Sequence, residues 1–230
     1  MYYYWDPLYL FIVIVSLVLG LATQAYIKRQ YGKWSEVPGT FGVSGASVAR
    51  SMLDSNGASN VGITHVAGHL TDFYDPRDNN LHLSDENFQG GSVASVAVAC
   101  HEAGHAVQTA KGYVPGKIRT AIVPVVNVAQ QLWSVVFFLG MVMPLFTIGG
   151  YTLMQIGVIL YAIPVVFQLV TLPVEIDASR RAVNYIGSTG ALTDKRGAKQ
   201  VLTAAALTYV AAALTSILQL LYLISRSDRN

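Results

Sequence analysis

Four long apolar stretches separate the polar segments of this chain, at about residues 8–27, 121–146, 149–172 and 201–224, and none contains a formal charge. A helix needs about 20 apolar residues to cross roughly 30 Å of hydrocarbon. One such stretch alone is compatible with a buried helix of a soluble protein, but four in 230 residues are not. The pattern therefore predicts a mainly α integral membrane protein with four transmembrane helices.

The polar segments between these stretches define the expected domain organisation. We expect an N-terminal transmembrane anchor over residues 1–27, a cytoplasmic region over 28–117, a transmembrane hairpin over 118–172, a cytoplasmic helix over 173–200, and a last transmembrane helix with a short tail over 201–230. The turn of the hairpin is expected between Pro144 and Gly150.

Charge sets the expected orientation of these segments. Only 12% of the residues are charged, and no positive charge precedes the first apolar stretch, which favours a retained anchor over a cleaved signal peptide. Lys and Arg number 15, and 13 of them fall in residues 28–120 and 173–200. Because basic residues favour the cytoplasmic side, we expect these two segments in the cytoplasm and both termini outside. Since topology accounts for the basic residues, the net charge of +2 does not indicate a nucleic-acid partner.

The sequence HEAGH at residues 101–105 lies in an apolar, alanine-rich segment that reads as a helix between an N-cap at Ser92 and a C-terminus at Lys111 and Gly112. Two histidines four residues apart lie about 40° apart around a helix, so both can reach one metal ion. Glu102 projects close to the same face and is placed to take a proton from a metal-activated water. Gly104 costs helix stability of roughly 1 kcal/mol, which indicates a close backbone approach.

A catalytic zinc ion needs a third protein ligand beside His101 and His105. Glu175 is the main candidate, because it opens an expected second cytoplasmic helix at Pro173, directly after the third apolar stretch, where the hairpin returns the chain to the histidines. Asp177 is the alternative ligand. Both acids are also compatible with a purely structural role at a helix N-terminus.

Other reactive residues have simpler interpretations. Cys100 is the only cysteine and is expected to be a small buried residue rather than a ligand. The pattern around His65 and His69 predicts an extended segment, where residues four apart are about 13 Å apart, so we do not expect a second metal site. Arg180 is a candidate catalytic residue that stabilises an oxyanion, with a membrane-surface cation as the alternative. Tyr74 and Arg181 are candidates for the same role, with a packing aromatic as the alternative for Tyr74 and a membrane-surface cation as the alternative for Arg181.

The segment before the motif predicts a small sheet. Residues 44–55 read as a short amphipathic helix, and residues 61–66 and 80–83 alternate like strands with turn signals between them. We expect the sheet beside the HEAGH helix, where an edge strand can bind an extended substrate by backbone hydrogen bonds. The sequence does not indicate which strand is the edge.

Several segments together carry a family resemblance. HEAGH, the preceding LTDFYDP of residues 70–76, Leu83-Ser84, and VEIDAS of residues 174–179 resemble the bacterial neutral zinc metallopeptidases of the YugP-like membrane group, over nearly the whole chain. The plan is more distantly similar to the CAAX-prenyl proteases and the heat-shock HtpX peptidases. The resemblance implies a zincin-like, gluzincin-type α+β catalytic region and a bacterial inner-membrane location. Those relatives commonly place an aspartate four residues after the ligand glutamate, where this chain has Ser179.

These observations predict a zinc endopeptidase with one Zn²⁺ held by His101, His105 and Glu175, and with Glu102 as the general base. The expected partners are a polypeptide substrate and the lipid bilayer, whereas the oligomeric state is not indicated. The alternative is an inactive membrane scaffold or partner subunit with a structural metal site. Retention of Glu102 disfavours this alternative, because a structural site gains nothing from that carboxylate. A metal transporter is disfavoured because the four stretches contain no acidic residue or histidine.

Overall fold

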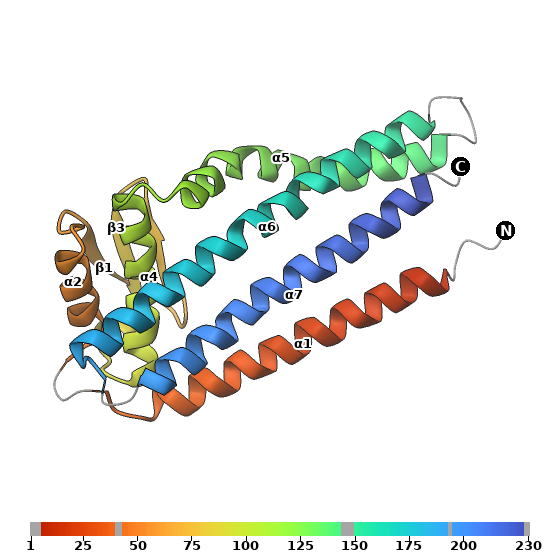
Figure 1. Ribbon diagram of the computed structural model, residues 1–230. Helices are drawn as coiled ribbons and strands as arrows, with labels where there is room; N and C mark the ends of the chain where they lie inside the picture. Colours follow the sequence, from red (N-terminus) through yellow and green to blue (C-terminus); the bar gives the residue numbers. More distant parts are fainter. Residues whose placement is uncertain (1–5, 40–42, 144–149, 193–194, 228–230) are drawn as a thin grey trace. The chain divides into compact units, whose positions relative to one another are not determined.

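The computed structural model of the chain describes residues 6–39, 43–143, 150–192 and 195–227. Most of these residues are helical (Figure 1). The elements are α1 (Pro7–Ser35), α2 (Gly45–Ser55), β1 (Gly62–Val66), β2 (Phe73–Asp75), β3 (Asn80–Ser84), α3 (Asp85–Gln89), α4 (Val93–Ala110), α5 (Val114–Val142), α6 (Gly150–Thr189) and α7 (Lys195–Ser227).

The expected apolar helices are present. Within the described ranges, α1, α5, α6 and α7 are long and apolar enough to cross a membrane. These four helices have 29, 29, 40 and 33 residues, so each extends beyond its apolar stretch into polar sequence. The expected hairpin turn between Pro144 and Gly150 falls mainly on residues outside the described ranges.

The prediction of a separate helix opening at Pro173 is wrong, because α6 continues without a break from Gly150 to Thr189. The continuation has a packing cause. Val174, Ala178, Ala182 and Ile186 recur every four residues and are all at most 1% exposed. This buried stripe keeps the chain helical past the apolar stretch, since tertiary packing outweighs the local signal of the proline.

Contacts divide the chain into two compact units, one of residues 1–22, 118–172 and 208–230, and the other of residues 23–117 and 173–207. In the first unit, a buried cluster joins α5, α6 and α7 through Phe137, Met154, Tyr161 and Leu223. Gly157 of α6 lies against the backbone of α5, where an added Cβ would be 2.7 Å from the Cα atom of Phe137. The second unit contains the sheet and the HEAGH helix.

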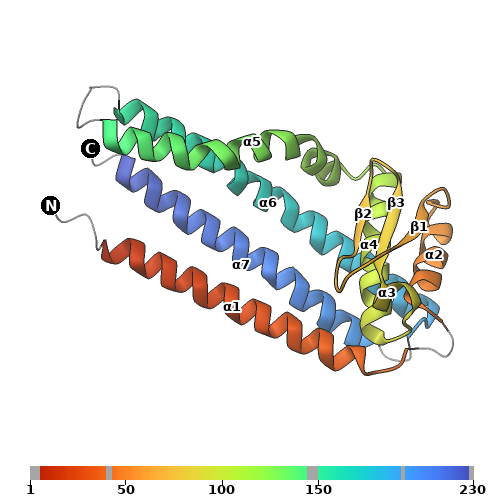
Figure 2. The ribbon, with the colours of Figure 1, turned by 180° about the vertical axis from the view of Figure 1, so that it is seen from behind.

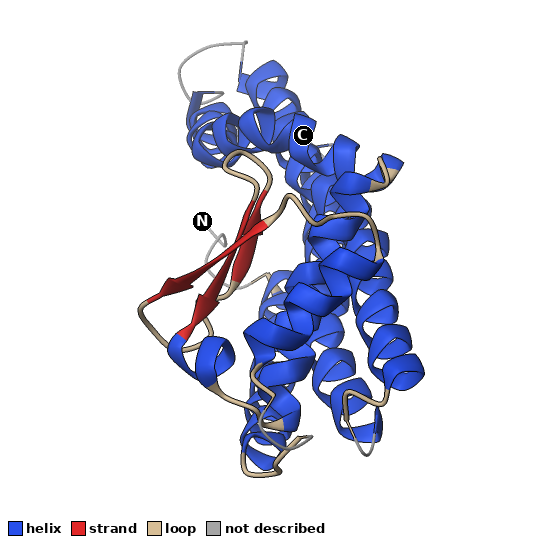
Figure 3. Ribbon diagram, turned by 90° about the vertical axis from the view of Figure 1, so that its left-hand side faces the viewer, coloured by secondary structure: helices blue, strands red, loops and turns tan. Residues whose placement is uncertain are grey.

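The predicted sheet is confirmed and has three strands in the order β1-β3-β2 (Figure 2). Strand β1 is parallel to β3, and β2 is antiparallel to β3. The sequence did not indicate β2, because three residues followed by Pro76 are too short to show alternation. Figure 3 shows the three strands as a small sheet next to the helices.

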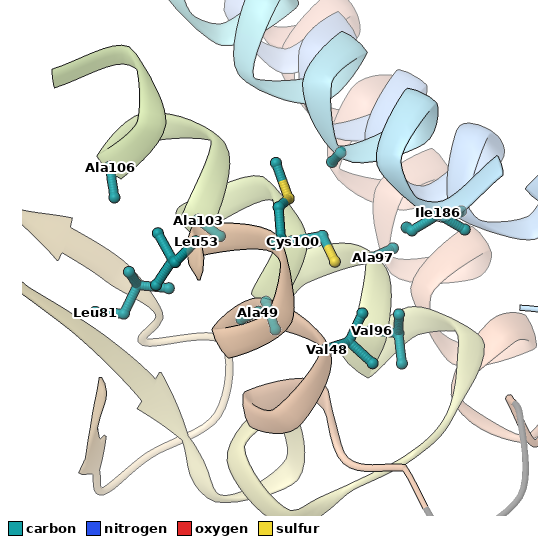
Figure 4. Packing of buried hydrophobic residues seen from close by; sticks show 14 of the residues in the cluster. Val48, Ala49, Leu53, Leu81, Val96, Ala97, Cys100, Ala103, Ala106 and Ile186 are labelled. Carbon is teal, nitrogen blue, oxygen red and sulfur yellow. The ribbon is translucent and has the colours of Figure 1, made fainter. Parts of the chain in front are cut away.

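Helix α4 is the centre of the second unit. Its alanine-rich faces pack against α2 and the sheet on one side and against α6 on the other (Figure 4). Ser92 caps the helix by accepting a hydrogen bond from Ser95 N, as predicted, and the predicted helix α2 is capped in the same way by Ser44. The small side chains allow α2 and α6 to approach α4 closely, and this places α6 beside the histidines.

Candidate metal centre

The two histidines of the motif lie on one face of α4, as their spacing predicts. The imidazole centroids of His101 and His105 are 4.8 Å apart, and the two side chains are 13% and 12% exposed. Each presents its Nε2 atom to the same carboxylate, that of Glu175 on α6. A helix thus supplies two imidazoles that converge on one point.

Glu175 is brought to the histidines by the buried stripe of α6. Its Oε2 atom lies 3.3 Å from Nε2 of His101 and 3.6 Å from Nε2 of His105, and the side chain is 3% exposed. In the part of the chain that the structure describes, these three residues are the one group of acidic, histidine or cysteine side chains that could hold a metal ion. We call them the metal-ligand cluster.

The spacing of the metal-ligand cluster fits zinc. A tetrahedral zinc ion with bonds of about 2.0–2.2 Å holds its ligand atoms roughly 3.3–3.6 Å apart. Two of the three separations, 3.3 Å and 3.6 Å between nitrogen and oxygen, match this geometry, and all three ligand atoms lie within 4.8 Å of one another. Two imidazoles and one carboxylate leave a fourth position open, which is the arrangement of catalytic rather than structural zinc sites.

Gly104 explains how α6 comes so close. A Cβ atom at this position would lie 2.8 Å from the backbone oxygen of Ala178 and 3.1 Å from its Cα atom. Any side chain there would push α6 away from α4, so the close approach predicted from Gly104 is confirmed. The glycine therefore determines whether Glu175 reaches the histidines.

Asp177 lies outside the metal-ligand cluster. Its Oδ2 atom accepts hydrogen bonds from Nε of Arg181 at 2.6 Å and from Nε2 of Gln108 at 2.8 Å. Oε1 of Gln108 lies 3.1 Å from Nδ1 of His105, so Asp177 contacts the histidine only through an amide. Nδ1 of His101, the ring nitrogen that does not face Glu175, contacts Oγ of Ser179 at 3.1 Å.

Glu102 lies between α4 and the sheet, where it accepts a hydrogen bond of 3.2 Å from the backbone N–H of Tyr74 on β2. Burial raises the pKa of Glu102 above its ordinary value of 4.5, and the nearby His101 and His105 oppose only part of this rise. A carboxylate with a raised pKa is a stronger base at neutral pH. For His105, burial lowers the pKa, but the hydrogen bond with Glu175 and the charge of Glu102 outweigh it, so the pKa is raised.

The remaining sequence candidates are not part of the metal-ligand cluster. Arg180 is exposed on α6, about 140° around the helix from Glu175, so its role at an oxyanion stays a prediction. Cys100 is fully buried in the core, as expected, and burial raises its pKa to about 12. His65 contacts Asp85, and His69 lies 3.0 Å from Glu86, so the described residues place no second metal-binding group there.

Two groups that contact these site residues were not predicted from the sequence: the side chain of Gln108 and the backbone N–H of Tyr74. Gln108 follows His105 by one helical turn, and this i, i+3 spacing is the signal that could have identified it. The Tyr74 amide had no such signal, because a backbone group of a three-residue strand leaves no trace in the residue pattern.

Comparison with known proteins agrees with this geometry. A family model described as "Putative neutral zinc metallopeptidase" matches residues 9–228. The chain belongs to this family. It is also 41% identical over 216 residues to "Putative membrane protease YugP" of Bacillus subtilis (strain 168), covering 93% of this chain and 94% of that protein. No solved structure matches the chain. The family resemblance expected from HEAGH and the flanking segments is thereby confirmed, and membership of the family implies zinc.

Proposed function

We propose that this chain is a membrane-embedded zinc endopeptidase that hydrolyses peptide bonds of polypeptides near the cytoplasmic face of a bacterial inner membrane. The observation that carries the proposal is the metal-ligand cluster, with two histidines and a glutamate at zinc-ligand spacing and Glu102 beside them. His101, His105 and Glu175 would hold one Zn²⁺ ion. When bound, the ion would supply an activated water and polarise the scissile carbonyl.

Glu102 is the general base of the proposed reaction. Its carboxylate accepts the proton of the attacking water and then transfers it to the leaving nitrogen of the peptide. The N–H of Tyr74 holds one oxygen of this carboxylate in place. Burial, which raises the pKa of Glu102, makes its carboxylate a stronger acceptor for the proton of the water.

Strand β2 is the proposed substrate-binding edge. It pairs with β3 on one side, and on the other side the N–H of Tyr74 points towards Glu102. An extended substrate that adds to this edge by backbone hydrogen bonds would therefore lie next to the general base. We expect recognition of backbone more than of sequence.

The test compares wild type with Glu102→Gln, each purified in detergent, by measuring bound zinc and cleavage of casein. We expect equal zinc content, because Glu102 is not a ligand, and activity reduced at least about 100-fold by loss of the base. Glu36→Gln is the matched control, since Glu36 is exposed outside the metal-ligand cluster, and it should keep full activity. A wild type that folds without binding added zinc, or a fully active Glu102→Gln, would refute the proposal.

A further inference from the structure

The outward nitrogens of the two histidines meet uncharged partners. Nδ1 of His105 lies 3.1 Å from Oε1 of Gln108, and Nδ1 of His101 lies 3.1 Å from Oγ of Ser179. In a metal-binding imidazole, the partner of the second nitrogen decides which nitrogen carries the proton and how the ring is oriented. Both contacts therefore orient an imidazole, and a partner that can only accept also makes Nε2 the nitrogen available to a metal.

Gln108 has only one possible amide orientation. Its Nε2 atom lies 2.8 Å from the backbone oxygen of Val174 and 2.8 Å from Oδ2 of Asp177, and both of these atoms can only accept hydrogen bonds when Asp177 is ionised. The NH₂ group must point to them, so Oε1 must face His105. Nδ1 of His105 is consequently the donor to Oε1, so its Nε2, which faces Glu175, is the nitrogen left to bind a metal ion.

Burial makes this orientation obligatory. Gln108 is 3% exposed, so a flipped amide would leave its polar atoms facing like groups without water to compensate. Val174 precedes Glu175 in the chain, so the same amide also fixes the turn of α6 that carries the third residue of the metal-ligand cluster.

Ser179 supports His101 in a weaker way. A hydroxyl both donates and accepts, so it is compatible with either tautomer of the imidazole. The acid available nearby, Asp177, is paired with Arg181 at 2.6 Å and is separated from His105 by the Gln108 amide.

We propose that Gln108 and Ser179 are the positioning residues of the metal centre, and that their neutral hydrogen bonds keep its zinc affinity below the affinity that a carboxylate partner would give. The inference rests on the proposed function for the identity of the ion. A carboxylate that accepts a hydrogen bond from Nδ1 would make Nε2 a stronger electron-pair donor to the metal. Loss of such a partner typically lowers metal affinity 10- to 100-fold. Gln108 supplies orientation without that added charge.

The first experiment measures the zinc dissociation constant of the detergent-purified full chain by competition with a chelating dye. Gln108→Met keeps the length of the side chain but removes both the acceptor and the donors. We expect its zinc Kd to rise about 10- to 100-fold. Gln89→Met, at an exposed position on α3, is the matched control and should bind zinc like wild type.

The second experiment isolates charge at the other histidine and does not depend on folding of the Gln108 variant. Ser179→Asp and Ser179→Asn introduce side chains of the same shape, so any disturbance of packing is shared. We expect Ser179→Asp to bind zinc at least about 10-fold more tightly than Ser179→Asn, because only the former gives His101 a carboxylate partner. A purely structural role of this position would give equal constants.

Wild-type affinity in Gln108→Met, or equal affinity of the two Ser179 variants, would overturn the positioning role. Neither measurement needs catalysis, so the two proposals fail separately. A wild type that binds zinc with the expected order of variants but never cleaves casein would refute the peptidase and keep the positioning residues. An enzyme that cleaves casein, but whose Gln108 and Ser179 variants bind zinc with unchanged affinity, would refute the positioning residues and keep the peptidase.

Discussion

At the scale of single residues, the chain shows which chemistry is visible in sequence and which is not. His101, Glu102 and His105 are predictable because helical periodicity is local, and three residues in one turn and a half already define a face. Glu175 is predictable only by combining a shortage of acids with the expected return of the chain. The contact of Gln108 with Val174 was not predictable, because it depends on how two helices far apart in sequence pack together.

Cys100 provides a residue-scale prediction about the integrity of the second unit. The thiol is fully buried, and its pKa of about 12 keeps it protonated at pH 8. Because the thiolate is the nucleophile, we expect no detectable alkylation of the native protein by iodoacetamide at pH 8, and complete alkylation in denaturant. Mass spectrometry of the intact protein measures both. Rapid labelling of the native form would show that α4 does not pack as described.

At the scale of elements, the decisive contact is between α4 and α6. The four apolar helices, α2 and two of the strands were predicted from hydrophobic patterns, since an element that buries one face has apolar residues at a regular spacing. The length of α6 and the existence of β2 did not follow. In both cases tertiary contacts outweigh the local signal, which is a proline for α6 and a strand of only three residues for β2.

Gly104→Ala tests the contact between α4 and α6. The added Cβ would be 2.8 Å from the backbone oxygen of Ala178, and a backbone neighbour cannot rotate away. We expect a net destabilisation of about 1–3 kcal/mol, despite the better helix propensity of alanine, and a zinc Kd raised at least about 10-fold as Glu175 moves away. Thermal unfolding in detergent and dye competition measure the two effects.

Gly32→Ala is the matched control for that variant, because nothing lies within 4 Å of a Cβ atom at Gly32 of α1. It should leave zinc binding unchanged and stabilise the helix by up to about 1 kcal/mol. If Gly104→Ala behaves like Gly32→Ala, the close approach of α6 is not needed for the metal centre.

At the scale of the whole molecule, one short chain contains four helices that are long and apolar enough to cross a membrane, and a second unit that contains the metal-ligand cluster. Hydropathy predicted these four apolar helices and the polar segments between them, because long apolar stretches are the strongest signal that a sequence contains. The expectation that the second unit is cytoplasmic follows from the distribution of Lys and Arg alone.

Orientation is tested by cysteine accessibility in intact cells, in a Cys100→Ala background. We expect Ser188→Cys, at an exposed position of the second unit, to be protected from a membrane-impermeant maleimide until the cells are opened. A cysteine added after Asn230 should be labelled in intact cells. The reverse pattern would place the proposed active site outside the cytoplasm, while leaving its chemistry unchanged.

The unbroken course of α6 has a mechanical consequence. Its 40 residues measure about 60 Å, roughly twice the thickness of a hydrocarbon core, so a helix long enough to cross the bilayer also carries Glu175. A rotation by one residue turns the carboxylate about 100° away from the imidazoles. Turning of this helix about its own axis would therefore take Glu175 out of the metal-ligand cluster.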